Sequence, residues 1–479
     1  MSRLLINNLK SDSLAWKNIN WKHAQSIVSG IQARIVKAVQ AGDKNRVRSL
    51  QRLLARSFAA KLLAVKRVTT NRGKNTPGVD GVTWKSPARK FREAQRLNLK
   101  RYRAKPLLRK YIPKSNKKKR PLGIPVIKDR AEQALELMAL DPVAECRADG
   151  MSNGFRKFRS THDAIGACFN ALRLKGSPIW IFEGDIAGCF DNFNHQWMLG
   201  NIPAHQRKLR MWLKAGCMEN ALLRPTTTGT PQGGIISPTL ANMALDGIES
   251  MLKAGFGRKY KIHFVRYADD FIITGATKHV LEDKVKPMVI EFLKTRGLEL
   301  SETKTTITHI NDGFDFLGFN IRKYKGTLLI KPAKAKIKEH LCKIKNIIKA
   351  NVATSTSSLI NKLNPIIRGW GYYYRFVVSK RVFSYVDHHI WLKLWHWAKR
   401  RHPQKGRRWI KDKYFQSVGT RHWVFREKQD SIALFRLSSI PIRRYIKIKA
   451  EANPYDVLWK TYFEQRLLRR SLPAVGARF

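Results

Sequence analysis

The chain has 479 residues, with 93 Lys and Arg against 34 Asp and Glu, and its formal net charge is +59. Because basic residues occur from end to end, the charge belongs to the whole protein and favours a polyanionic partner, most simply a nucleic acid. Aromatic residues make up 10% of the chain, which excludes a disordered arginine-rich tract. The length suffices for two to four domains, each with its own core.

The cysteines are scattered and odd in number, and none forms a CxxC pair. This pattern argues against a disulfide framework and against a structural zinc site. The N-terminus lacks the apolar core of a secretory signal, and no stretch reaches the roughly 20 apolar residues that a membrane span needs. We therefore expect a soluble protein of a reducing compartment without a membrane partner, in the bacterial cytoplasm or in an organelle.

The first third of the chain alternates between helical and strand-like patterns. Residues 16–70 have apolar side chains at helical spacing and predict helices. Residues 107–127 contain two short apolar segments around a basic loop, Lys114 to Arg120, as in a hairpin. A further helix is predicted over residues 129–146, with Asp129 as its N-cap.

Two aspartates follow the apolar run at residues 179–186. Asp185 lies at or near the end of this predicted strand and has no local partner. Asp191 precedes a predicted helix, and capping is the commoner role of Asp at such a position. Asp185 is therefore the better candidate for a metal ligand.

Two adjacent carboxylates, Asp269 and Asp270, interrupt an apolar run at residues 264–273. Its Val, Ile, Phe and Tyr residues predict two short strands, with the acidic pair at the turn between them. Buried carboxylates need a positive partner. That partner is either Arg or Lys in an ion pair, or a divalent cation. With Asp185 included, three carboxylates from neighbouring strands could hold two Mg²⁺ ions about 4 Å apart.

The second half of the chain changes from mixed to helical character. Residues 229–238 form a Gly/Pro-rich loop, and the irregular alternation of helices and strands to about residue 328 predicts an α+β domain with an antiparallel sheet. From Lys331 onward the pattern is helical, basic and rich in aromatics, which suits RNA through phosphate contacts and stacking, or a bundle core. A linker is predicted at residues 402–413, followed by a small basic domain.

Several segments match one family in order. They are YIPKSNKKKRPLGIP, DRAEQALELMALDP, SNGFRKFRSTHDAI, TPQGGIISPTLANMALDGIE, FVRYADDFII, LSETKT, FDFLGF and LNPIIRGWGYYYRFV. The ordered set resembles the reverse transcriptase and maturase proteins of mobile group II introns, over roughly residues 75–400. The resemblance implies a right-hand polymerase fold of fingers, palm and helical thumb, preceded by a helical extension.

The resemblance also implies a role for each matching residue. The metal-binding and catalytic carboxylates would be Asp185, Asp269 and Asp270, and Lys304 would donate a proton to pyrophosphate. Phe190 would exclude a 2′-hydroxyl. The nucleotide-binding set is Lys114, Arg120, Phe190, Gln232 and Gly233. The primer grip is Leu317, Gly318 and Phe319. In the segment that resembles domain X of the thumb, RNA contacts are expected at Arg368, Trp370, Tyr373 and Arg375.

The resemblance implies four domains. They are an RNA-binding extension (1–90), fingers and palm (91–328), thumb or domain X (329–405) and a DNA-binding domain (406–479). The expected function is RNA-directed DNA synthesis from dNTPs with two Mg²⁺ ions, combined with binding of intron RNA, splicing, and mobility by target-primed reverse transcription on a DNA target and primer. No CxxC pair or His-Asn cluster matches the family's HNH endonuclease module. The alternatives are a splicing factor with an inactive polymerase fold, or a reverse transcriptase of a retron or diversity-generating element. The oligomeric state stays open.

Overall fold

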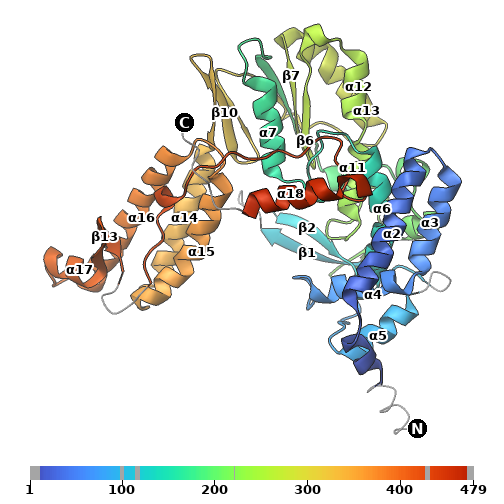
Figure 1. The fold of residues 1–479 in the computed structure, drawn as a ribbon, viewed down its shortest axis with the longest axis horizontal. Coiled ribbons are helices and arrows are strands. Elements are labelled where there is room, and N and C mark those ends of the chain that lie inside the picture. Colours follow the sequence, from blue (N-terminus) through green and yellow to red (C-terminus); the bar gives the residue numbers. More distant parts are fainter. Residues whose placement is uncertain (1–10, 98–101, 114–118, 221, 427–431, 472–479) are drawn as a thin grey trace. The chain divides into compact units, whose positions relative to one another are not determined.

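The computed structural model describes residues 11–97, 102–113, 119–220, 222–426 and 432–471 (Figure 1). The chain divides into two compact units. The first contains residues 1–164, 180–307 and 448–468, and the second contains residues 165–179, 308–447 and 469–479. Both units mix helices with antiparallel strands, as the α+β prediction requires. None of the described helices is long and apolar enough to cross a membrane.

The first unit begins with helices that pack around a long buried one. They are α2 (Trp21–Gln40), α3 (Lys44–Arg56), α4 (Phe58–Thr70), α5 (Pro87–Arg96) and α6 (Ile127–Arg147). Figure 1 shows α2, α3 and α4 beside α6. Their shared core includes Ile35, Leu54 and Ala131. The helical prediction for residues 16–70 is therefore confirmed, because the apolar faces that follow the 3.6-residue period are the ones buried.

The predicted N-cap of α6 is wrong. The helix begins at Ile127 after Val126, so Asp129 lies in its first turn. The Asp129 carboxyl accepts hydrogen bonds from Tyr102 Oη (2.8 Å) and Lys105 N (2.9 Å). Burial raises the pKa of this carboxyl to about 6. Asp129 thus connects α6 to residues 102–105 by hydrogen bonds, a tertiary role that the local sequence does not reveal.

Two four-stranded sheets belong to the first unit, except that the last residues of one strand, β8, belong to the second. The fingers sheet has the order β2-β1-β4-β5 and consists of β1 (Leu107–Pro113), β2 (Lys119–Ile124), β4 (Cys217–Glu219) and β5 (Leu222–Arg224). The palm sheet has the order β6-β7-β3-β8 and consists of β3 (Trp180–Gly184), β6 (Phe264–Tyr267), β7 (Asp270–Gly275) and β8 (Thr306–His309). Strands β3, β6 and β7 pair antiparallel, which brings the two predicted acidic segments into one sheet.

Short helices cover the palm sheet. They are α8 (Cys189–Asn192), α9 (His195–Asn201), α10 (Gln206–Leu213), α11 (Ser237–Leu245), α12 (Ile248–Gly255), η2 (Val280–Val285) and α13 (Lys286–Lys294). Phe182, Phe271 and Ile273 lie fully buried beneath them. Helices α11 and α12 are separated at Gly247, whose φ of 108° interrupts the helical backbone.

The second unit holds a three-stranded sheet and a helical bundle. Its elements are β9 (Phe314–Phe316), β10 (Phe319–Tyr324), β11 (Thr327–Pro332), α14 (Lys334–Ala350), α15 (Thr356–Tyr374), α16 (Lys380–Arg401), α17 (Arg407–Tyr414), β12 (Phe415–Val418), β13 (Arg421–Phe425) and η3 (Leu437–Ser439). The linker predicted at 402–413 is wrong over most of its length. Residues 407–414 form α17, because Ile410 and Tyr414 bury their side chains.

Candidate active site

The acidic hairpin is the centre of the candidate site. Tyr267 pairs with Asp270, leaving Ala268 and Asp269 as a two-residue turn in which Ala268 has a φ of 59°. Gly184 of β3 pairs with Phe271 of β7. A Cβ at Gly184 would come within 2.2 Å of the Phe271 ring, so glycine permits this register. Asp185 therefore follows β3 directly beside Asp270, and the three predicted carboxylates meet at one end of the sheet.

The three carboxylates give this site an excess of negative charge. The pKa of Asp270 rises to about 6, chiefly because the surrounding protein partly desolvates its carboxyl, and next because the charges of Asp269 and Asp185 lie close. Lys304 counters this rise. Its Nζ lies 2.8 Å from Asp185 Oδ2, and that hydrogen bond raises the pKa of the lysine. A bound cation would keep the Asp270 carboxyl ionised in spite of its raised pKa.

The site fits a divalent metal by the chemistry of its donors. Three carboxylates supply the hard oxygen ligands that Mg²⁺ prefers. Within the described residues, however, no three His, Cys, Asp or Glu side chains are arranged to hold a metal as they stand. The sequence analysis considered an ion pair for Asp269 and Asp270, whereas in the structure Lys304 pairs with Asp185.

A buried arginine supports the hairpin from beneath. Arg266 is fully buried and forms an ion pair with Asp246. Its Nη1 also donates to Asn242 Oδ1 (3.0 Å) and to the carbonyl of Ala268 in the turn (3.2 Å). Burial raises the pKa of Asp246 to about 7 although Arg266 opposes the rise. Sequence reasoning missed this pair, although a lone Arg in an apolar run was an available signal.

Phe190 lies on the short helix α8, five residues beyond Asp185. Its ring meets that of Phe155 edge to face, with the centroids 6.4 Å apart. Its carbonyl accepts a hydrogen bond from Thr230 N at 2.7 Å. The Gly/Pro-rich loop thus fixes the backbone from which Phe190 projects.

The same loop connects α8 to the fingers sheet. Gln232 Nε2 lies 3.3 Å from an Asp191 carboxylate oxygen, and its carbonyl accepts from Gly123 N at 2.8 Å. Gly233 has a φ of 122°, and a Cβ there would lie 2.8 Å from the Gly123 carbonyl. The predicted capping role of Asp191 is wrong, since Gly188 precedes α8 and Asp191 lies within it.

The predicted basic residues of the fingers hairpin are only partly placed. Arg120 lies exposed on β2, opposite Ile112 of β1. Lys114 lies outside the described residues.

The predicted primer grip forms a tight turn in the second unit. Leu317 and Gly318 have φ values of 52° and 84° and connect β9 to β10, as a two-residue hairpin of the I′ type requires. Tyr373 Oη donates to the Leu317 carbonyl (3.2 Å), and Tyr374 Oη donates to the Gly318 carbonyl (3.0 Å). Helix α15 therefore fixes the orientation of this turn, a connection that the sequence did not predict.

The residues predicted to contact RNA have mixed environments. Trp370 stacks on His340 at 4.7 Å, and the Tyr373 ring stacks on Phe319 at 5.2 Å. Both rings pack within the unit. Arg368 is exposed over the Phe435 ring, and desolvation lowers the pKa of Arg375.

Comparisons with known proteins identify the family of the chain. A model described as "Reverse transcriptase (RNA-dependent DNA polymerase)" matches residues 112–321, and a second model, described as "N-terminal domain of reverse transcriptase", matches residues 16–97. These define a reverse transcriptase. The "Group II intron, maturase-specific domain" matches residues 337–415. The chain belongs to the family of group II intron reverse transcriptases and maturases, as the sequence resemblance predicted.

Individual relatives support the assignment. "Protein YkfC" of Escherichia coli (strain K12) is 32% identical over 62% of this chain and 88% of its own length. "Group II intron-encoded protein LtrA" of Lactococcus lactis subsp. cremoris is 31% identical over 57% of each, so the chain spans little more than half of LtrA. "Maturase-like protein 1" of Euglena gracilis is 24% identical over 77% of this chain and 82% of its length.

Solved structures also match. Apo telomerase from Candida Tropicalis has a TM-score of 0.41 and 12% identity, covering 66% of this chain and 60% of its own.

Proposed function

We propose that the protein is an RNA-directed DNA polymerase whose metal ligands are Asp185, Asp269 and Asp270. The observation that carries the proposal is the meeting of these carboxylates at one end of β3 and β7, with the pKa of Asp270 raised to about 6 by desolvation and by the other two. Their charges make a cation the natural partner of the site.

Two Mg²⁺ ions are the proposed cofactor. When bound, they would lower the pKa of the attacking 3′-hydroxyl and stabilise the charge that develops on the leaving pyrophosphate. Lys304 lies at the same site, and its raised pKa keeps it protonated, so it can supply a proton to that leaving group. Phe190 would restrict the sugar position. Arg120 would contact the triphosphate.

We propose two further sets of contacts, one to the incoming nucleotide and one to the primer. Gln232 and Gly233, held between α8 and β2, would shape the floor beneath the nucleotide. The turn at Leu317, Gly318 and Phe319 would grip the primer, and Tyr373 and Tyr374 would orient it through its carbonyls.

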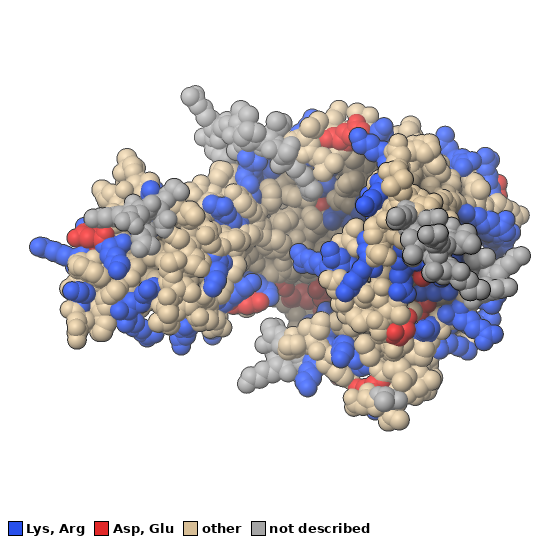
Figure 2. Space-filling model, turned by 90° about the horizontal axis from the view of Figure 1, so that it is seen from below, with Lys and Arg blue, Asp and Glu red and all other residues tan. Residues whose placement is uncertain are grey.

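We also propose that the protein binds its group II intron RNA, assists splicing, and supports mobility by target-primed reverse transcription. The match to the maturase-specific domain supports this proposal, together with the net charge of +59. Figure 2 shows Lys and Arg side chains scattered across the visible face, where they outnumber those of Asp and Glu. The free cysteines suit a reducing compartment, and we propose the bacterial cytoplasm.

The polymerase proposal is tested with the double variant Asp269→Ala/Asp270→Ala. We expect it to abolish Mg²⁺-dependent cDNA synthesis on an RNA template while intron RNA affinity stays within about twofold of wild type. Synthesis by the double variant would overturn the assignment of these ligands. A wild-type protein that binds the RNA but never extends a primer would instead support a splicing factor with an inactive polymerase fold.

The RNA-binding proposal is tested by salt titration. Phosphate contacts release condensed counterions, so the logarithm of the affinity should fall linearly and steeply with the logarithm of salt concentration. A nearly flat dependence between 50 and 300 mM KCl would contradict binding through phosphates.

A further inference from the structure

A segment near the C-terminus rejoins the unit that contains the candidate site. After residues 308–447 in the second unit, Ile448–Leu468 belong again to the first. We call this segment the C-terminal strap; it includes η4 (Val457–Trp459) and most of α18 (Lys460–Ser471). It lies beyond residue 415, where the maturase match ends, so the family match assigns it no role.

The first anchor of the strap is a buried ion pair. Asp163 Oδ1 accepts from the Ile448 backbone N at 2.7 Å and from Arg466 Nη2 at 2.6 Å, and both acidic and basic side chains are at most 3% exposed. Arg466 Nη1 also donates to the Phe158 carbonyl at 2.9 Å. One arginine thus joins α18 to both ends of the segment 158–163.

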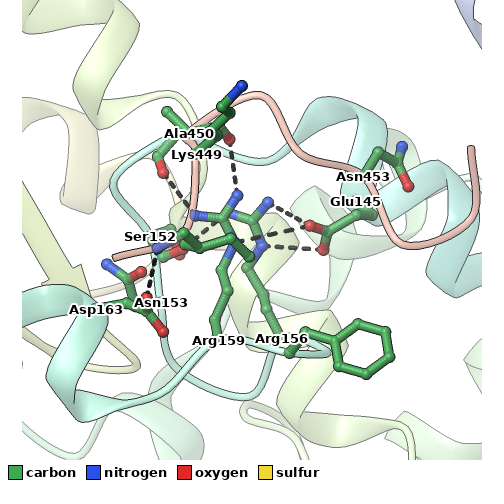
Figure 3. A network of polar contacts seen from close by, with 12 residues as sticks. Glu145, Ser152, Asn153, Arg156, Arg159, Asp163, Lys449, Ala450 and Asn453 are labelled. Atoms are coloured by element: carbon green, nitrogen blue, oxygen red, sulfur yellow. Dashed lines mark hydrogen bonds and ion pairs between the residues drawn. The ribbon is translucent and has the colours of Figure 1, made fainter. Parts of the chain in front are cut away.

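The second anchor is a network formed by Arg156 and Arg159, which both lie on the loop of residues 149–160 (Figure 3). Arg159 donates to the Ala450 carbonyl of the strap at 2.7 Å and to the Gly150 carbonyl at 2.8 Å. Arg156 pairs with Glu145 of α6 at 2.6 Å and donates to the carbonyl of Ser152 at 2.8 Å. The guanidinium groups therefore connect the strap to the loop 149–160 and fix that loop on α6.

Aromatic residues add two more contacts. The Phe463 ring stacks on Phe158 with 4.8 Å between centroids. Tyr455 Oη donates to the half-buried Asp141 carboxylate of α6. The strap is thus held at both of its halves, and neither contact involves the candidate active site.

The loop that the strap holds is paired with the acidic hairpin. Asn153 N donates to the Arg266 carbonyl at 2.9 Å, and Arg266 N donates to the Met151 carbonyl at 3.1 Å. Ser152 and Arg266 form a parallel bridge at the edge of β6. A Cβ at Gly154 would lie 2.2 Å from Ala268 N in the turn. Because no space separates the loop from the turn, a shift of the loop displaces the turn that carries Asp269.

The same loop supports Phe190. Phe155, next to Gly154, meets the Phe190 ring edge to face. Phe155 is 54% exposed and has a φ of 59°. Its position depends on the loop backbone, because so exposed a side chain has few packing contacts to hold it. The loop therefore links the strap to the acidic turn and to the proposed sugar-selecting residue.

We propose that the C-terminal strap is a positioning element of the polymerase site, which holds the loop 149–160 so that the Asp269–Asp270 turn and Phe190 keep their places. Arg466, Arg159 and Asp163 are its positioning residues. The inference rests on the proposed function, since it assigns the strap a part in DNA synthesis. A strap that only stabilised the fold would leave catalysis unchanged below the melting temperature.

The test compares full-length Arg466→Ala with Lys460→Ala, which removes an exposed cation from the same helix. Both are assayed at least 15 °C below their own melting temperatures. For Arg466→Ala we expect kcat for primer extension to fall at least tenfold, incorporation of ribonucleotides to rise severalfold, and RNA affinity to stay within twofold. Arg466→Lys keeps the charge but not the two-pronged contact, and it should recover part of kcat. Lys460→Ala should match wild type.

Hydrogen exchange gives a readout that needs no activity. In Arg466→Ala, amides of residues 150–156 and 264–270 should exchange at least tenfold faster, while those of α2 and α4 should not change. Unchanged exchange at the hairpin together with wild-type kcat and sugar selectivity would overturn the inference. If wild type extends no primer, the proposed polymerase fails, whereas hairpin exchange still decides the role of the strap. If Arg466→Ala does not fold, Asp163→Asn is judged by the same criteria.

Discussion

Lys304 Nζ donates to Asp185 Oδ2 at 2.8 Å, so a proposed proton donor lies on a proposed metal ligand. The Lys304 ammonium group and a metal cation cannot both bind the Asp185 oxygen at the same time. Metal binding would therefore release Lys304 toward the pyrophosphate. We propose that the lysine competes with the metal before the metal binds and supplies a proton afterwards.

Replacing Lys304 should separate these two effects. In Lys304→Gln, the Mg²⁺ concentration for half-maximal primer extension should fall by roughly three- to fivefold, because an exposed ion pair contributes up to about 1 kcal/mol. The maximal rate should fall by about 10², the usual loss when a general acid is removed. Mg²⁺ titrations of initial rates check both. Lys294→Gln, an exposed lysine on α13, is the control. An increased Mg²⁺ requirement in Lys304→Gln would contradict the competition.

The raised pKa of Asp270 predicts a pH dependence. Only the ionised carboxylate binds a cation, so protons and metal compete below about pH 6. At Mg²⁺ well below half-saturation, the rate should fall with decreasing pH through about 6, approaching a tenfold loss per pH unit. Saturating Mg²⁺ should move this limb to lower pH. Rates between pH 5 and 8.5 at the two concentrations test this, and a flat profile at low Mg²⁺ would contradict it.

Phe190 should control the choice of sugar. Phe190→Val shortens the side chain proposed to exclude the 2′-hydroxyl, and we expect ribonucleotide incorporation relative to dNTP to rise roughly 10- to 100-fold, the range for reshaping one contact of a pocket. Single-nucleotide extension with matched dNTP and rNTP measures the ratio. Phe169→Val, an exposed position on α7 (Thr161–Leu172), should leave it unchanged. Equal ratios in the two variants would count against this role.

Arg266 should stabilise both the fold and the hairpin. Arg266→Leu leaves Asp246 buried without its partner, and such a loss costs about 3–5 kcal/mol of unfolding free energy. Urea unfolding at pH 8 checks the value. Lys278→Leu, which breaks the exposed pair with Glu282, should change stability by no more than ~0.5 kcal/mol.

The same variant should respond to pH in a defined direction. Burial already raises the pKa of Asp246 to about 7, and loss of Arg266 raises it further. A carboxyl whose folded pKa exceeds its unfolded value takes up a proton on folding, so stability increases as pH falls toward the unfolded value. Arg266→Leu should therefore lose less stability at pH 5.5 than at pH 8. An equal or larger loss at pH 5.5 would contradict the buried carboxylate as the cause.

Local pattern predicted the elements best where burial follows a simple period. The helices of residues 16–70 and the strands around Asp269 and Asp270 agree with the structure because their apolar spacing matches the faces they bury. Capping was predicted poorly. Asp129 and Asp191 have hydrogen-bond partners distant in sequence. Nothing in the local sequence distinguishes an aspartate that caps a helix from one that bonds to a distant residue. The linker at 402–413 failed because two well-spaced buried side chains suffice for a short helix.

The sequence by itself determined the charge, the order of the family segments and the identity of the acidic residues, since these depend on residue types and spacing alone. Tertiary structure decided what surrounds them. Strand pairing set Asp185 beside Asp270, folding placed Lys304 on Asp185, and Arg266 became a buried support. The return of residues 448–468 to the first unit was likewise decided only by folding, because contacts between residues 285 to 314 positions apart leave no periodic signal in the chain.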